Sequence, residues 1–188
     1  MNIYQSVLGK FSAKYRVNVK EVFDGIYDME YVMVKFDSPK IHDNFPKQYK
    51  IGSDLDIYTT PEFVYKIKNK ILEVNLNKKL KAKIIQSDKN IRIRYQFCNI
   101  SNLLFDINIY DQENNTFWHD SIKKHRLLKG IKTPEMKYEL VVRAKTYIEN
   151  TNKKYHLSFI KEHKNEIDFN LMNKQGINQS FLTQFKIK

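Results

Sequence analysis

Two aspartates and a glycine-serine pair stand together in residues 51–58, which read Ile-Gly-Ser-Asp-Leu-Asp-Ile-Tyr. Side chains on a β-strand alternate between faces, so Asp54 and Asp56 would share one face while Leu55 and Ile57 point into the protein. The two carboxylates would then lie roughly 6–7 Å apart along the strand. Two bare like charges are costly in a dry site, but this spacing suits the chelation of a divalent cation.

A third aspartate, Asp106, is the one charge in the apolar run 103–110. Its predicted strand face carries both apolar and polar side chains, namely Leu104, Asn108 and Tyr110. Such a mixed face is more typical of a cleft than of open solvent. The alternative interpretation is that residues 52–54 form a simple turn and that Asp106 faces solvent.

The glycine and the serine add a second kind of chemistry to the aspartates. Gly52 permits a sharp backbone turn and the close approach of a bulky anion. Ser53 places a hydroxyl donor beside it. Together they suit the approach of an anion beside the carboxylate pair.

This order of motifs, Gly-Ser, Asp-x-Asp, a helix and then strands with a third Asp, resembles the nucleotidyltransferase fold of the DNA polymerase β superfamily. The Gly-Ser pair directly precedes the Asp-x-Asp, which is closest to a bacterial branch with a Gly-Asp-x-Asp motif. In that branch an apolar strand ending in Lys and a loop precede the motif, and here residues 31–36, with Lys35, and a proline-containing loop stand in that place. The resemblance covers residues 31–110.

The resemblance implies an enzyme that transfers a nucleoside monophosphate from a nucleoside triphosphate to an unknown hydroxyl or phosphate acceptor. It implies that three residues are catalytic and hold Mg²⁺ or Mn²⁺, namely Asp54, Asp56 and Asp106. The nucleotide-binding residues that we expect are Gly52, Ser53 and Lys145. Lys35 could approach a phosphate as a point charge, although a solvated strand end is the simpler interpretation of this residue.

Other functions fit part of the same pattern. A metal-dependent glycosyltransferase also uses Asp-x-Asp, on a nucleotide-sugar, and a metal-dependent phosphotransferase could use the same carboxylates. A non-catalytic binding module could keep the fold and use its basic surface for a partner. The sequence decides neither the acceptor nor the oligomeric state.

Hydrophobic periodicity predicts the elements that would position these residues. We expect helices over residues 1–30, strands at 31–36, 81–86 and 91–97, and a helix from a capping box at Thr59 and Glu62 to residue 75. The predicted fold class is α/β (α+β), with a mixed sheet flanked by helices and the C-terminal helices packed on it. The predicted domains are residues 1–115, nucleotidyltransferase-like, and residues 116–188, helical.

The net charge of +12 suits attraction to polyanions, including nucleic acid. Only five of the 33 basic residues are arginines, whereas base-specific contacts favour arginine, so we expect no sequence-specific nucleic-acid binding. The lysine excess is also what an AT-rich genome produces. One cysteine, no signal-peptide pattern and no apolar run of membrane-spanning length predict a cytoplasmic protein.

Overall fold

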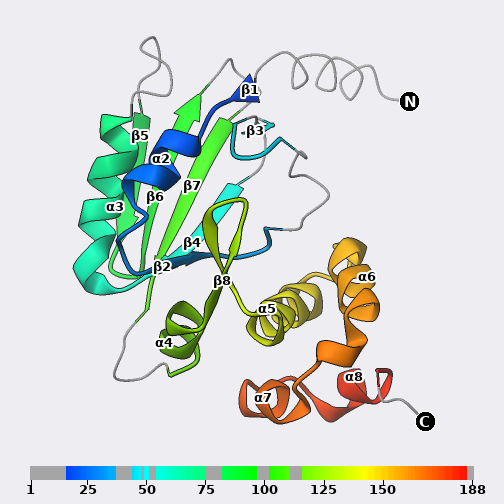
Figure 1. The fold of residues 1–188 in the computed structure, drawn as a ribbon. Coiled ribbons are helices and arrows are strands. Elements are labelled where there is room, and N and C mark those ends of the chain that lie inside the picture. The colour runs from blue at the N-terminus through cyan, green and yellow to red at the C-terminus, as the bar shows by residue number, and fades with distance from the viewer. Residues whose placement is uncertain are drawn as a thin grey trace, which may run out of the picture. The chain divides into compact units, whose positions relative to one another are not determined.

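The computed structural model of the chain describes residues 16–36, 44–47, 49–50, 54–74, 82–96, 102–110 and 116–185. The chain divides into two compact units, Met1–Thr133 and Pro134–Lys188. The first unit is built on β-sheets and the second on helices (Figure 1). The domains expected from the sequence, 1–115 and 116–188, stay a prediction.

A five-stranded mixed sheet with the order β2-β4-β7-β6-β5 forms the centre of the first unit (Figure 1). The strands are β2 (Tyr31–Met33), β4 (Asp54–Thr59), β5 (Ala82–Ser87), β6 (Asn90–Gln96) and β7 (Asn102–Ile109). β4 and β7 run parallel, and every other pair is antiparallel. Parallel neighbours need a long crossover, which here contains helix α3 (Pro61–Glu73) and the β5–β6 hairpin. The predicted mixed sheet flanked by helices is confirmed.

One face of this sheet is apolar because β-branched and aromatic residues alternate in register across its strands. Ile57 on β4 lies beside Ile107 on β7, which lies beside Ile91 on β6. All three are fully buried. Helix α3 covers this core with side chains at helical spacing, namely Val64, Ile67 and Ile71. The short helix α2 (Lys20–Gly25) adds Val22 and Phe23 to the same core.

The remaining elements of the first unit are short. Strands β1 (Arg16–Val17) and β3 (Tyr49–Lys50) form a two-stranded sheet, and helix α4 is Thr116–Lys123. Strands β8 (His125–Leu128) and β9 (Ile131–Pro134) form a hairpin. Its two-residue turn has positive φ at both positions, 53° at Lys129 and 80° at Gly130. This geometry matches the twist of a hairpin, and glycine adopts it without a steric penalty.

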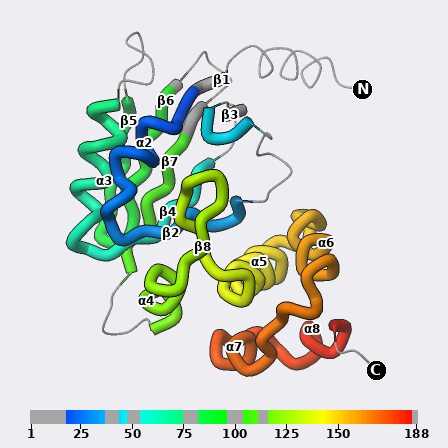
Figure 2. The backbone as a smooth tube through the Cα atoms, in the orientation of Figure 1, coloured from blue at the N-terminus to red at the C-terminus, as the bar shows by residue number. Residues whose placement is uncertain are grey.

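The second unit is a run of helices that Figure 2 shows as a continuous path from α5 to α8. They are α5 (Met136–Glu149), α6 (Lys154–Glu162), the 3₁₀ turn η1 (Lys164–Glu166), α7 (Phe169–Lys174) and α8 (Gln179–Thr183). Two begin at side-chain caps, because Asp168 accepts from the Leu171 N–H and Asn178 from the Phe181 N–H. Among the described residues, no helix is both long and apolar enough to cross a membrane.

Two sequence predictions about local structure are wrong. Of the helical stretch expected over residues 1–30, helix α2 is present, but Arg16–Val17 is a strand, and residues 1–15 lie outside the described part. The capping box at Thr59 is absent, because Thr59 ends β4 and its hydroxyl donates to the Glu30 carbonyl oxygen at 2.6 Å. Thr60 is the residue that precedes helix α3.

The core of the sheet gives a first testable prediction. Replacing the fully buried Ile57 with alanine should lower the free energy of unfolding by about 2–5 kcal/mol, because it leaves a cavity in the hydrophobic core on the apolar face of the sheet. The matched control is Ile84→Ala on the edge strand β5, where the isoleucine is 43% exposed. Urea unfolding followed by fluorescence of Trp118 measures both variants. Equal losses in the two would contradict this account of the core.

Candidate functional site

The opposite face of the central sheet carries polar side chains, and the strand register brings two predicted aspartates together. Asp56 on β4 lies directly beside Asp106 on β7, and Asp106 lies beside Arg92 on β6. Neighbouring strands are about 4.8 Å apart. Asp54, two residues before Asp56, is on the same face of β4 and is exposed. The face predicted for Asp54 and Asp56 is therefore the face that also carries Asp106.

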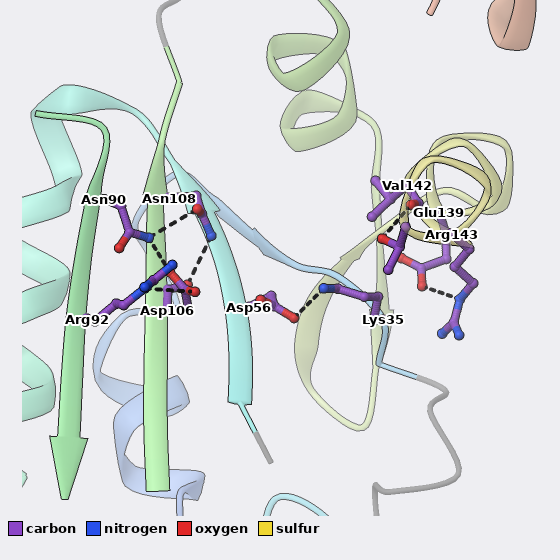
Figure 3. A network of polar contacts seen from close by, with 10 residues as sticks. Lys35, Asp56, Asn90, Arg92, Asp106, Asn108, Glu139, Val142 and Arg143 are labelled. Carbon is purple, nitrogen blue, oxygen red and sulfur yellow. Dashed lines mark hydrogen bonds and ion pairs between the residues drawn. The ribbon is translucent and has the colours of Figure 1, made fainter. Parts of the chain in front are cut away.

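Asp56 forms an ion pair with Lys35, at 2.7 Å between Oδ2 and Nζ (Figure 3). Both groups are largely withdrawn from water, since the Lys35 side chain is 23% exposed and that of Asp56 15%. The backbone fixes the approach of the two residues, because the Val34 N–H donates to the Asp56 carbonyl oxygen at 3.0 Å. Lys35 is thus a partner of a site carboxylate, and its interpretation as a solvated strand end is wrong.

The backbone of Lys35 has φ of 58°, which lies in the left-handed region. For a residue with a Cβ atom this conformation costs of order 1 kcal/mol, so it persists only where other contacts compensate for it. The bend lies two residues after the last residue of β2, Met33. The ion pair with Asp56 is one contact that compensates for this strain.

Asp106 is held by two side chains from β6. The Arg92 Nε lies 3.4 Å from Asp106 Oδ2, and the Asn90 side-chain amide donates to Asp106 Oδ1 (Figure 3). The same Asn90 amide donates to Asn108 Oδ1 at 3.1 Å, which joins three polar residues across β6 and β7. Arg92 is 52% exposed, so its ion pair is weaker than that of Lys35.

The electrostatics of the two groups follow from this arrangement. Burial raises the pKa of the Asp56 carboxyl; the Lys35 ammonium opposes that shift, and the charges of Asp54 and Asp106 add to it. For Lys35, burial alone would lower the pKa, but attraction to Asp56, Tyr58 and Asp54 raises it above its ordinary value. Burial therefore disfavours the charged form of Asp56, and a cation that reaches this carboxylate favours it.

An aromatic stack lies on the same face, beyond Asp56 on β4. The rings of Tyr58 and Trp118 are parallel within 11°, and their centroids are 3.6 Å apart. Trp118 belongs to helix α4, so the stack packs this helix against one end of the polar face.

The three residues predicted to bind the nucleotide lie outside the polar face that the structure describes. Gly52 and Ser53 lie outside the described residues, so their phosphate-binding role stays a prediction. Lys145 lies on α5 in the second unit, where its Nζ donates to Gln175 Oε1 at 3.1 Å. Burial lowers the pKa of Lys145. Its contact with a nucleotide also stays a prediction.

Within the part of the chain that the structure describes, no three His, Cys, Asp or Glu side chains converge on a common point. The reason is visible in Figure 3, where Asp56 is directed to Lys35, and Asp106 to Arg92 and Asn90. Sequence reasoning missed these three partners. Apolar and polar residues alternate along β6, and this pattern could have placed Arg92 on the polar face. Nothing in the residues next to Lys35 predicts that it approaches Asp56.

No protein-family model matches the chain, and the comparison with curated proteins also found no match. Among solved structures, the chain is similar to a candidate nucleotidyltransferase from H. pylori, with 11% identity and a TM-score of 0.40, over 90% of this chain and 84% of that one. It is also similar to a cytoplasmic RNA terminal U-transferase, with 12% identity and a TM-score of 0.27, over 82% of this chain and 47% of that one. A third is the Cid1 poly(U) polymerase, with 12% identity and a TM-score of 0.26, over 77% of this chain and 46% of that one.

The chain spans less than half the length of the last two structures. All three TM-scores lie below 0.5, so these likenesses assign neither an activity nor a substrate to this chain.

The raised pKa of Asp56 predicts how the metal-free protein responds to loss of this charge. Asp56→Asn should leave the free energy of unfolding at neutral pH nearly unchanged, because the neutral amide avoids the burial cost of the carboxylate and the repulsion of Asp54 and Asp106, and this gain offsets the loss of the ion pair with Lys35. Chemical denaturation in the presence of a chelator measures this. A loss as large as the roughly 3–5 kcal/mol expected for breaking a structural buried ion pair would show that Asp56 serves stability instead.

Proposed function

We propose that this chain is a divalent-metal-dependent nucleotidyltransferase whose centre is the aspartate row on the polar face of the central sheet. The observation that carries the proposal is the register of β4 and β7, which sets Asp56 beside Asp106 with Asp54 two residues away on the same face. A structural role does not require three carboxylates on one sheet face, since their mutual repulsion is unfavourable to folding.

The chemistry of the three side chains fits the proposed metal. Carboxylate oxygens are the preferred ligands of Mg²⁺ and Mn²⁺ in proteins that bind nucleotide phosphates. The Lys35 ammonium contacts Asp56 in the way that a metal cation would. Asp54, Asp56 and Asp106 would hold the metal, which when bound supplies positive charge to neutralise the phosphates of a nucleoside triphosphate.

The proposed reaction forms one bond at the α-phosphorus and breaks another. The oxygen of an acceptor hydroxyl attacks the α-phosphorus, the bond to the β-phosphate oxygen breaks, and pyrophosphate leaves. Asp106 would accept the proton of the attacking hydroxyl. Asp54 and Asp56 would fix the position of the phosphates, and Gly52, Ser53 and Lys145 would contact the nucleotide.

A thermal-stability panel tests this proposal. In the presence of Mg²⁺ or Mn²⁺, one nucleoside triphosphate at about 100 times its dissociation constant should stabilise the wild type by roughly 2–3 kcal/mol. The shift should disappear in Asp56→Asn and when the metal is chelated. The matched control is Asp24→Asn, an exposed aspartate that pairs with Lys20 on α2 and should respond like the wild type.

The same panel separates the other functions. A metal-dependent shift with nucleotide-sugars but not with nucleoside triphosphates would replace this proposal with a glycosyltransferase or a phosphotransferase. Stabilisation by polyanions without metal dependence would favour a non-catalytic basic module. If no ligand changes the thermal stability, the proposed nucleotide site is contradicted.

Catalysis gives a separate prediction for the other two aspartates. Asp54→Asn and Asp106→Asn should each reduce the transfer of α-labelled phosphate from a nucleoside triphosphate at least about 100-fold, while the far-UV circular dichroism is unchanged. RNA, protein and small-molecule acceptors are supplied in parallel, and Asp24→Asn is again the control. Near-normal transfer by either variant would show that its carboxylate has no role in the reaction.

A further inference from the structure

In this structure cations of the chain itself occupy both facing carboxylates of the aspartate row. Lys35 holds Asp56, and Arg92 with Asn90 holds Asp106. The two arrangements differ, because Arg92 is half exposed at 3.4 Å whereas Lys35 is largely buried at 2.7 Å. The Lys35 ammonium contacts Oδ2 of Asp56 and would repel a divalent cation at the same carboxylate, so a metal that binds Asp56 competes electrostatically with Lys35.

The position of Lys35 is constrained in a way that a surface lysine is not. Its backbone is in the left-handed region, where lysine is disfavoured, and the preceding residue is hydrogen-bonded to the backbone of Asp56. The chain thus bends at this point and delivers one ammonium group to one carboxylate. Backbone strain of this kind concentrates at functional sites because the surrounding structure compensates for it.

We propose that Lys35 is a tethered counter-ion that neutralises Asp56 in the metal-free protein and is displaced from Asp56 when a divalent cation binds. The proposal rests on the proposed function, because it assumes that Asp56 is a metal ligand. Lys35 is in this view a positioning residue: it balances the charge of Asp56 without a metal, and it sets the metal concentration at which the site fills.

The physical reason is an exchange between two cations. Without Lys35, Asp56 would be a largely buried carboxylate close to two other carboxylates, which is unfavourable. With Lys35, the metal binds against the charge of a neighbouring ammonium, so its apparent affinity falls. Removing the ammonium should therefore tighten metal binding, although it removes a polar group from the site.

The test is a titration with Mn²⁺ alone, with free Mn²⁺ measured by electron paramagnetic resonance. Lys35→Asn is the informative variant, because asparagine tolerates positive φ and is uncharged. We expect it to bind Mn²⁺ about tenfold or more tightly than the wild type. The matched control is Lys20→Asn, which removes the same charge from an exposed ion pair and should stay within about twofold of the wild type.

Lys35→Arg separates charge from side-chain packing. Arginine keeps the positive charge and can pair with a carboxylate through two N–H groups, so this variant should bind Mn²⁺ no more tightly than the wild type. Circular dichroism of each variant verifies folding. If Lys35→Arg and Lys35→Asn tighten binding equally, the ammonium is not the competitor and the inference is overturned.

The remaining outcomes distinguish this inference from the proposed function. Equal Mn²⁺ affinity in the wild type and in Lys35→Asn, with binding lost in Asp56→Asn, overturns the counter-ion role and leaves the metal site standing. Absence of Mn²⁺ binding in the wild type and in Lys35→Asn overturns the metal site and the inference with it. If Lys35→Asn binds Mn²⁺ more tightly than the wild type and Asp56→Asn does not bind it, the result supports both the metal site and the counter-ion role.

Discussion

The repulsion between Asp56 and Asp106 is the constraint on which the rest of this sheet depends. The parallel pairing of β4 and β7 sets the two residues side by side, and a slip by one residue would turn Asp106 toward the apolar core. The neighbouring pair Ile57 and Ile107, fully buried on the other face, opposes such a slip. The hydrophobic core thus holds in place a pair of like charges that would otherwise separate.

The chain compensates for that repulsion from both sides of the pair. Lys35 approaches from the end of β2, and Arg92 with Asn90 approaches from β6, so each carboxylate has its own cationic partner. Local conflict of this kind, a positive φ at lysine and clustered acids on a half-buried face, is unfavourable for folding by itself. Sequences keep such conflicts mostly where function requires them.

Alternation along single strands was enough to predict the sheet and the shared face of Asp54 and Asp56, because period-2 patterns are local. The partner of Asp56 could not be predicted in this way. Lys35 reaches Asp56 only because β2 and β4 pair and because the backbone bends at the lysine. The residues next to Lys35 in the sequence predict neither the pairing nor the bend. The capping box failed for a related reason, since Thr59 is used by β4 before the helix begins.

The net charge of +12 acts on the two proposed ligands in opposite directions. A positive chain repels a free divalent cation and attracts an anionic metal–nucleotide complex. On the proposed function, the Lys35 ammonium beside Asp56 adds a local repulsion of the same sign. On the proposed function, both effects favour a metal that arrives with its nucleotide, whose phosphates can accept the displaced ammonium as a new partner.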